Sequence, residues 1–221
     1  VGVIAFMFSK NQNIKKIGEV IIGFGVLFMG LSSMSAAMSG MKESQYILDL
    51  FASLKSPLFA ILLGFVITGI VQSSSVTVSI MVLLANQNLL GMDICMYITL
   101  GCNIGSCTTA LIASLSGKKD AKRAAMIHFL FNVIGTAIMY VILWLAMDWV
   151  LSAFIGIAGN NPGRIVAYAH MFFKLFLVIV LTPFIGAIVK LTYLIIPGDD
   201  KKIGYRENFQ LKYIGDKVVL N

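Results

Sequence analysis

The sequence has 221 residues, of which 58% are hydrophobic and only 12% are charged, and its mean hydropathy is +0.90. Because a soluble domain carries about 45–50% apolar and about 25% charged residues, this composition excludes an ordinary soluble domain and predicts an all-α, polytopic membrane protein in a lipid bilayer. The net charge of +7 indicates cytoplasmic loops rich in Lys and Arg. No nucleic-acid partner is predicted, because basic residues are not interleaved with aromatic ones on a soluble surface.

Two apolar elements and an amphipathic one open the chain. Residues 1–9 lack an initial Met, a basic segment and a cleavage site, so we interpret them as the end of a preceding transmembrane helix. Residues 17–38 are long enough to cross a hydrocarbon core of about 30 Å, and their glycines allow close helix packing. Residues 43–54 are too short to span and show a helical apolar stripe, which predicts an amphipathic helix at the interface.

The next two apolar segments are each interrupted by polar residues. Residues 56–87 carry "QSSS" at 72–75 and are either one tilted span or two half-helices folded as a hairpin. Residues 92–115 are interrupted by "GCNIGSCTT" at 101–109. After the basic run "GKKDAKR" at 117–123, the sequence predicts a span over 124–150, a turn at 159–163 and a last long span over 168–196. We interpret residues 197–221 as a cytoplasmic tail.

The distribution of Lys and Arg favours the hairpin. With Lys10, Lys15 and Lys16 inside the cell, the span over 17–38 places the amphipathic helix outside. A full crossing by residues 56–87 would put the basic run outside as well, whereas a re-entrant hairpin keeps the basic run and the tail in the cytoplasm. We therefore predict a multi-pass protein of the cell membrane with a re-entrant helical hairpin, a broken transmembrane helix and a cytoplasmic C-terminus.

The polar residues of the first break are candidate ligands. Irregular backbone at membrane depth is tolerated only inside protein or beside a water-filled cavity. The hydroxyl oxygens of Ser73, Ser74 and Ser75 and the amide of Gln72 suit Na⁺. The same hydroxyls, with the free N–H groups at the start of a half-helix, suit an oxyanion. These residues could instead bond backbone carbonyls or join helices, but four of them in one turn favour a site.

The polar residues of the second break are candidate ligands for the same reason. Two glycines permit unwinding, and the side chains of Asn103, Ser106, Thr108 and Thr109 supply oxygens. Two broken elements near the bilayer midplane are typical of a transporter's substrate site.

Three weaker signals remain. His128 and Asn132 lie four residues apart on one helix face, which favours helix packing. Lys174 is charged within a predicted span, which marks a functional candidate, but it lies near the outer end of that span, where snorkelling to the interface explains it equally. The three cysteines lack a CxxC spacing, and we interpret them as small apolar fillers.

The motifs resemble those of the sodium-dependent phosphate cotransporter family (type II Na/Pi). The resemblance rests on "GFGVLFMGLSSMS" at 23–35, "QSSS" at 72–75, "GCNIGSCTTA" at 101–110 and "AKRAAMIHFLFN" at 121–132, in that order. It implies an inverted-repeat architecture in which this chain is the second repeat, paired with a first repeat before Val1 or with another copy. Cys107 stands where the family has Thr, so no ligand role is transferred to it, and Lys174 stands where Asn often follows His-x-x-Phe.

The residues and the resemblance together predict that residues 17–196 form a membrane transport domain for Na⁺-coupled symport of inorganic phosphate by alternating access. Na⁺ is the coupling ion, and no organic cofactor is expected. The predicted substrate-binding residues are Gln72, Ser73, Ser74, Ser75, Asn103 and Ser106. The predicted Na⁺ ligands are Gln72, Ser74, Ser75, Asn103, Thr108 and Thr109.

Two alternatives stay open at this point. The first keeps the fold but transports another oxyanion or a carboxylate, because hydroxyl and N–H groups serve any of these substrates. The second is an intramembrane serine hydrolase with one of Ser73, Ser74 or Ser75 as nucleophile and His128 as base. The sequence has no GxSxG-type elbow, and we predict that the protein is not an enzyme.

Overall fold

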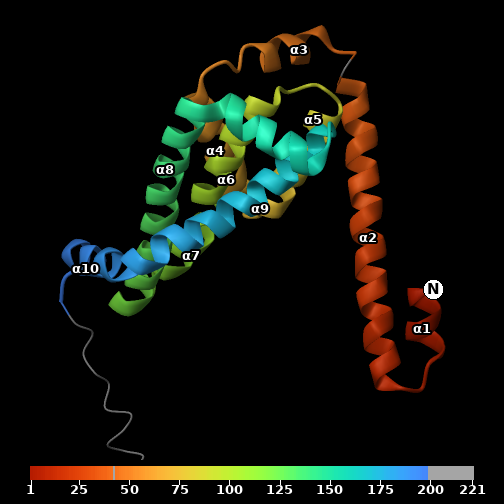
Figure 1. Cartoon of the computed structure of the whole chain (residues 1–221). Helices are drawn as coiled ribbons and strands as arrows, with labels where there is room; N and C mark the ends of the chain where they lie inside the picture. Colours follow the sequence, from red (N-terminus) through yellow and green to blue (C-terminus); the bar gives the residue numbers. More distant parts are fainter. Residues whose placement is uncertain (42, 199–221) are drawn as a thin grey trace, which may run out of the picture.

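The computed structural model describes residues 1–41 and 43–198, and every regular element in them is helical, which confirms the all-α class. Lys42 and residues 199–221, most of the predicted tail, lie outside the described residues. The helices are α1 (Gly2–Phe8), α2 (Gln12–Met41), α3 (Gln45–Ala52), α4 (Pro57–Val71), α5 (Ser74–Asn86), α6 (Met92–Gly105), α7 (Thr108–Ser114), α8 (Lys119–Ala158), α9 (Pro162–Leu181), the 3₁₀ turn η1 (Thr182–Phe184) and α10 (Ile185–Ile195) (Figure 1).

Four helical stretches within the described residues are long and apolar enough to cross a membrane. They are Gln12–Ala37, Met92–Ser114, Lys119–Ala158 and Pro162–Ile195. The helices α4 and α5, with 15 and 13 residues, are apolar but shorter than the roughly 20 residues that a span requires.

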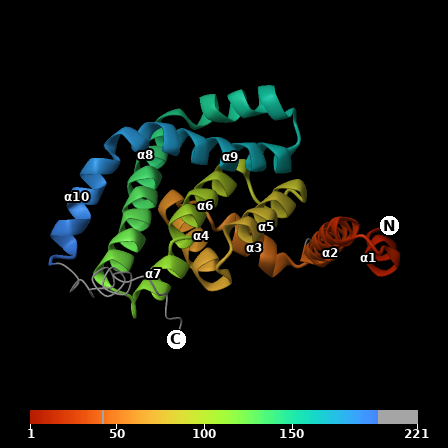
Figure 2. The same ribbon diagram turned by 90° about the horizontal axis from the view of Figure 1, so that it is seen from below.

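The helix α2 lies at the edge of the molecule, with α1 beside it and α5 as its contact to the bundle (Figure 2). Most of its large apolar side chains are exposed, including Phe24, Phe28 and Met29. The contact between α1 and α2 is close, because a Cβ atom on Gly18 would lie 2.8 Å from the backbone nitrogen of Phe6. An apolar, exposed helix of this length suits a hydrocarbon environment, where apolar side chains need no burial in protein.

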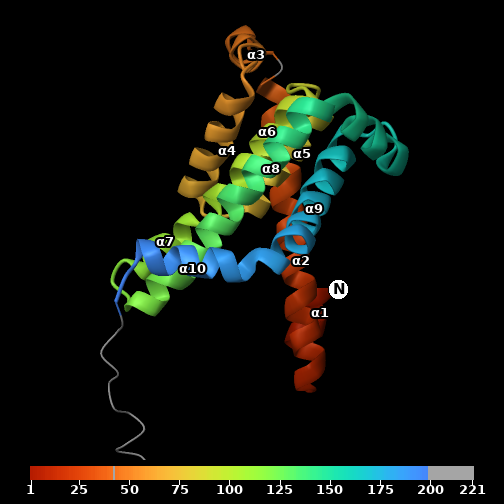
Figure 3. The same ribbon diagram turned by 60° about the vertical axis from the view of Figure 1, so that its left-hand side comes forward.

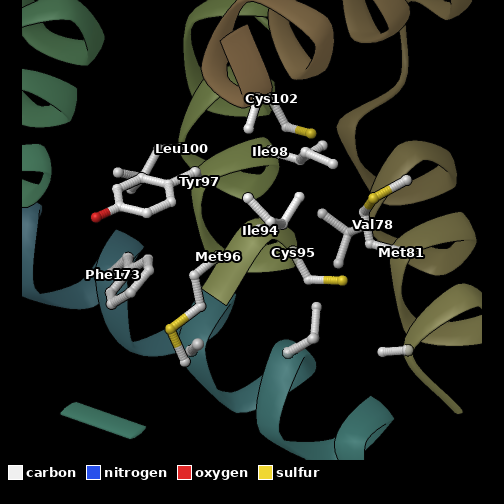
Figure 4. Packing of buried hydrophobic residues seen from close by; sticks show 14 of the residues in the cluster. Val78, Met81, Ile94, Cys95, Met96, Tyr97, Ile98, Leu100, Cys102 and Phe173 are labelled. Carbon is white, nitrogen blue, oxygen red and sulfur yellow. The ribbon is translucent and has the colours of Figure 1, made fainter. Parts of the chain in front are cut away.

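The core is built around α6, which α4, α5, α8 and α9 surround. All residues of α6 from Ile94 to Asn103 are buried. Figure 4 shows Val78 and Met81 of α5 and Phe173 of α9 against the side chains of this central helix. The three cysteines are free and buried, in agreement with their interpretation as apolar fillers.

Small residues bring α4 and α6 into backbone contact. The buried residues of α4 are Ala60, Gly64 and Thr68, spaced four apart along one face. A Cβ atom on Gly64 would overlap the carbonyl oxygen of Ile98, and one on Gly101 would overlap that of Ile61. In lipid, where no hydrophobic force drives helices together, such small-residue faces permit the close packing that stabilises a helix pair.

The contacts of α4 with α6 also show that the chain reverses direction between them. Gly64 faces Ile98, and further along both helices Thr68 faces Gly105, so α4 and α6 run parallel. The chain must therefore return between them, and α5 is the returning segment (Figure 3). The helices α4 and α5 form a hairpin with its turn at Gln72 and Ser73. That this hairpin is re-entrant in a bilayer stays a prediction.

The basic run and the end of α10 lie together, at the end of the molecule opposite α3 (Figure 1). The buried guanidinium of Arg123, 4% exposed, donates hydrogen bonds to the carbonyls of Ile196, at 3.0 and 3.2 Å, and of Gly198. It also pairs with Asp120 at 3.0 Å and lies 4.0 Å from the ring centroid of Tyr193. These bonds fix the start of α8 to the last described residues of the chain.

The predicted starts of the last two spans are wrong. The basic run is mostly helical, because α8 begins at Lys119, five residues before the predicted span, and continues to Ala158 through a kink at Ala146. The predicted last span begins earlier, with α9 at Pro162. Proline has a favourable φ there, and Asn161 caps the first turn by accepting a hydrogen bond from Arg164 N at 2.9 Å.

The predicted last span also bends. Pro183 lies in η1, where the missing N–H group and the proline ring interrupt the helix between α9 and α10. Lys174 consequently lies in the interior of α9, twelve residues after Pro162 and seven before Leu181. The prediction that Lys174 sits near the outer end of its span is therefore wrong.

Candidate functional site

The first break is a true turn. Gln72 follows α4 in the left-handed conformation, with φ 56° and ψ 24°, and its backbone N–H donates to the carbonyl of Thr68 at 2.7 Å. Ser73 caps α5, and its hydroxyl oxygen accepts a hydrogen bond from Val76 N at 3.4 Å. Left-handed backbone costs a residue with a Cβ atom about 1 kcal/mol, so contacts on both sides must hold the turn.

Two buried threonines supply those contacts. Thr68 of α4 donates its hydroxyl hydrogen to Thr77 Oγ1 of α5 at 3.1 Å, and Thr77 donates to the carbonyl of Ser73 at 3.2 Å. Both threonines are fully buried. The end of α4 and the start of α5 are therefore tied together beneath the turn. Sequence reasoning missed this pair, although a threonine on each side of "QSSS" was the available signal.

The remaining side chains of the first break are available to a ligand. Gln72 and Ser75 are exposed, and Ser74 is half-buried in the first turn of α5. Within the described part of the chain, the hydroxyls of Ser74 and Ser75 donate no hydrogen bond to protein. Ser75 lines a hollow of about 230 Å³ between α2 and α5, together with Gly30 and Ser79. The first N–H groups of α5 also lack helical partners, as in any helix.

The second break is narrower than the sequence predicts. Only Ser106 and Cys107 separate α6 from α7, and both keep right-handed helical dihedral angles. The glycines Gly101 and Gly105 do not unwind α6 but allow its contact with α4. The break consists of a tightened turn, in which Cys107 N donates to the carbonyl of Ile104 at 3.0 Å.

The hydroxyl groups of this second break are already used. Ser106 donates to the carbonyl of Asn103 at 2.7 Å, and Thr108 donates to the carbonyl of Gly105. A hydroxyl that donates to a carbonyl keeps its oxygen lone pairs, so it can coordinate a cation but has no hydrogen left for an anion. Thr109 is exposed.

Asn103 is the unusual residue of the second break. Its side chain is 0% exposed, and neither Nδ2 nor Oδ1 has a hydrogen-bond partner among the described residues. A buried polar group without a partner costs about 1–3 kcal/mol, and such a group in a native structure calls for an explanation such as a ligand.

The structure brings the two breaks together. A Cβ atom on Gly69, three residues before Gln72, would lie 3.4 Å from Thr108 Oγ1. A Cβ atom on Gly105, just before Ser106, would lie 2.7 Å from Thr68 Cβ. Both breaks therefore lie at the same level of the α4–α6 contact.

The residues proposed for hydrolysis do not form a relay. Asn132 is buried and donates its amide to the carbonyl of His128 at 2.9 Å, whereas the His128 side chain is exposed. In the residues that the structure describes, no hydrogen bond joins His128 to a serine of the first break. The same residues contain no group of three His, Cys, Asp or Glu side chains that could hold a metal ion.

The long apolar helices are those of a multi-pass membrane protein, and two adjacent polar breaks among such helices are typical of a membrane transporter. A sequence profile described as Na⁺/Pi-cotransporter matches residues 37–192. The chain belongs to the Na⁺/Pi-cotransporter family, as its motifs indicated.

Individual relatives agree with this family. The chain is 28% identical over 200 residues to "Uncharacterized protein YqeW" of Bacillus subtilis, which covers 89% of this chain and 63% of that protein. It is 25% identical to "Putative inorganic phosphate export protein YjbB" of Escherichia coli K12, over 86% of this chain and 34% of the relative. It is 38% identical to rat "Sodium-dependent phosphate transport protein 2C" over 38% of this chain and 14% of the relative. The chain thus spans less than two thirds of these relatives. No solved structure matches it.

Proposed function

We propose that this chain forms a transport unit that couples Na⁺ to the movement of inorganic phosphate across the cell membrane by alternating access. The family assignment supports a phosphate transporter, and the names of the mammalian relatives support sodium as the co-substrate. The observation that carries the proposal is the adjacent pair of breaks, one with free hydroxyl donors and one with a fully buried, unpartnered Asn103.

The first break suits the anion, and the second break suits the cation. Ser74 and Ser75 offer hydroxyl hydrogens beside the positive end of α5, which suits a phosphate oxygen. Ser106 and Thr108 offer only oxygen lone pairs, which suits Na⁺. The Asn103 amide has both an acceptor and a donor, so it can contact both ligands. Gln72 and Ser73 form the turn, and the exposed Gln72 side chain can reach the same ligands. Of the predicted Na⁺ ligands, Thr109 is the weakest candidate, because it is exposed.

Orientation and assembly follow from the same features. The bonds of Arg123 to Ile196 and Gly198 join the basic run to the end of the described chain, which supports a cytoplasmic location for both by the positive-inside rule. With the hairpin re-entrant from the opposite side, the transport domain over residues 17–196 pairs with a first repeat or with another copy.

Uptake by the purified full-length protein in liposomes tests the proposal. With an inward Na⁺ gradient we expect accumulation of labelled phosphate, which stops when choline replaces Na⁺. Reversing the gradient in phosphate-loaded vesicles should drive export, because a coupled carrier follows its driving ion in either direction. The experiment with the reversed gradient also tests export, the direction that the name of the Escherichia coli relative gives. No phosphate movement under either gradient would overturn the proposal. Equal movement of sulfate or a dicarboxylate would favour another anion as substrate.

A further inference from the structure

Lys174 is a charged residue inside the helical bundle that the two breaks do not explain. It lies in the interior of α9 and is half-buried. Its neighbours on the helix, Phe173 and Leu177, are 1% and 2% exposed. A cation in the interior of a membrane-spanning helix is costly unless another group compensates its charge.

The packing of α9 against α5 places Lys174 beside the first break. The backbone N–H of Gly163 donates to Asn86 Oδ1 at 2.8 Å, so the start of α9 meets the end of α5. The two helices pack against each other from this shared end, and Figure 2 shows α9 continuing past α5 toward α8. Eleven residues along α9 from Gly163 lead to Lys174, and eleven residues back along α5 from Asn86 lead to Ser75. At the same rise of about 1.5 Å per residue, Lys174 and Ser75 lie equally far along their helices from this contact.

The packing of α9 also brings Lys174 into the neighbourhood of the second break. The helix α9 packs against α6, and Cys102 and Cys107 are neighbours of Lys174. These two cysteines flank the unpartnered Asn103 in sequence. Lys174 therefore lies near the end of α6, where the second break begins.

Within the described residues, no carboxylate forms an ion pair with Lys174. The Arg123–Asp120 ion pair lies at the start of α8. The polar neighbours that surround Lys174 are also short of partners, because His170, one turn earlier on α9, has a buried Nδ1 atom without a hydrogen bond. An unpaired cation among unpaired neutral groups is suited to receive an anion.

We propose that Lys174 is a substrate-binding residue, whose ammonium group pairs with the transported oxyanion between the serines of α5 and Asn103. This inference rests on the proposed function, since it takes the anion of that site as the ligand. A fixed positive charge attracts the anion and repels the co-transported cation, so its removal has effects of opposite sign on the two ligands.

Equilibrium binding to the purified full-length protein tests this proposal through that difference in sign. Lys174→Met is compared with wild type and with Lys190→Met, which removes an exposed lysine from α10. Phosphate affinity is measured at saturating Na⁺, and Na⁺ affinity is measured without phosphate. We expect Lys174→Met to weaken phosphate binding about tenfold or more, as for loss of a charge-assisted hydrogen bond. We expect its Na⁺ affinity to be equal or higher, its thermal stability to rise, and Lys190→Met to match wild type.

Each other outcome contradicts a defined claim. Unchanged phosphate affinity in Lys174→Met would overturn this inference and leave the proposed function standing. A parallel loss of phosphate and Na⁺ binding would show a structural role and overturn it as well. Absence of phosphate binding by wild type would overturn the proposed function and this inference with it. If Lys174→Met does not fold, Lys174→Gln must bind phosphate at least tenfold more weakly than Lys174→Arg.

Discussion

The two polar breaks look alike in sequence but differ in structure. The first reverses the chain through a left-handed Gln72 and leaves the hydroxyls of Ser74 and Ser75 free. The second barely interrupts the helix, and its hydroxyls at Ser106 and Thr108 already bond carbonyls. What a polar cluster in an apolar segment can bind therefore depends on whether its hydroxyl hydrogens already bond backbone carbonyls. Free hydroxyl hydrogens can bind an anion, whereas hydroxyls that already donate can only coordinate a cation.

The largest expected effect comes from separating the two breaks. Gly64→Ala would place a Cβ atom into the carbonyl of Ile98, and the rigid helix backbone cannot move aside. We expect a loss of about 3 kcal/mol in the free energy of unfolding, at the upper end for overpacking, and loss of ligand binding at both breaks. Thermal unfolding in detergent measures it. Gly25→Ala is the matched control, since nothing lies within 4 Å of its added Cβ atom; equal stability of the two variants would contradict the close α4–α6 contact.

A pair of serine variants tests the division between anion and cation. Ser74→Ala removes a free donor, and we expect phosphate affinity to fall about tenfold to a hundredfold, as for a hydrogen bond to a charged group. Ser106→Ala removes an oxygen lone pair beside Asn103, and we expect Na⁺ affinity to fall more than phosphate affinity. Calorimetric titration with each ligand separates the two effects, with Ser152→Ala on exposed α8 as control. If both variants lost the two affinities equally, the breaks would not have separate roles.

Asn103 provides a test of stability against function. Because its buried amide has no partner, Asn103→Leu should raise the free energy of unfolding by about 1–2 kcal/mol without ligands. The same variant should lose Na⁺-dependent phosphate binding. Chemical unfolding and binding are measured on one preparation. A destabilised Asn103→Leu protein would show that the amide has a structural role that the present contacts do not reveal.

The smallest expected effect is at the turn itself. Gln72→Gly relieves the left-handed backbone of a residue with a Cβ atom, and we expect a gain of up to about 1 kcal/mol in stability. Ligand affinity should change little if the Gln72 side chain only shapes the turn, and should fall if it is a ligand. A loss of stability would mean that the Gln72 side chain holds the hairpin.

The sequence predicted the helical class and the elements with the clearest patterns. Long apolar runs defined the spans, and the positive-inside rule favoured a hairpin at residues 72–75 before any geometry was known. Helix ends were less predictable. The start of α9 at Pro162 depends on the cap of Asn161, which the sequence pattern assigns to a turn. The 3₁₀ turn η1 depends on Pro183, which the pattern assigns to a continuous span.

The sequence located the two polar breaks but not the contacts of their side chains. It named Asn103 and the serines as candidate ligands, which stays a prediction. It could not show that Ser106 and Thr108 would bond neighbouring carbonyls, because one hydroxyl suits a carbonyl or an ion equally. The spacing of Ala60 and Gly64, or of Gly101 and Gly105, was a usable signal for helix contact. The position of Lys174 depends on the register between α5 and α9, which the contact of Gly163 with Asn86 sets across 77 residues.

The central claim is that phosphate and Na⁺ share one site made by both breaks. The most direct test is the phosphate dissociation constant of the purified full-length protein in Na⁺ and in choline at equal ionic strength. We predict that phosphate binds about tenfold or more tightly in Na⁺, and that Na⁺ binds more tightly in phosphate by the same factor, as thermodynamic linkage requires. Equal phosphate affinity in the two salts would contradict the claim.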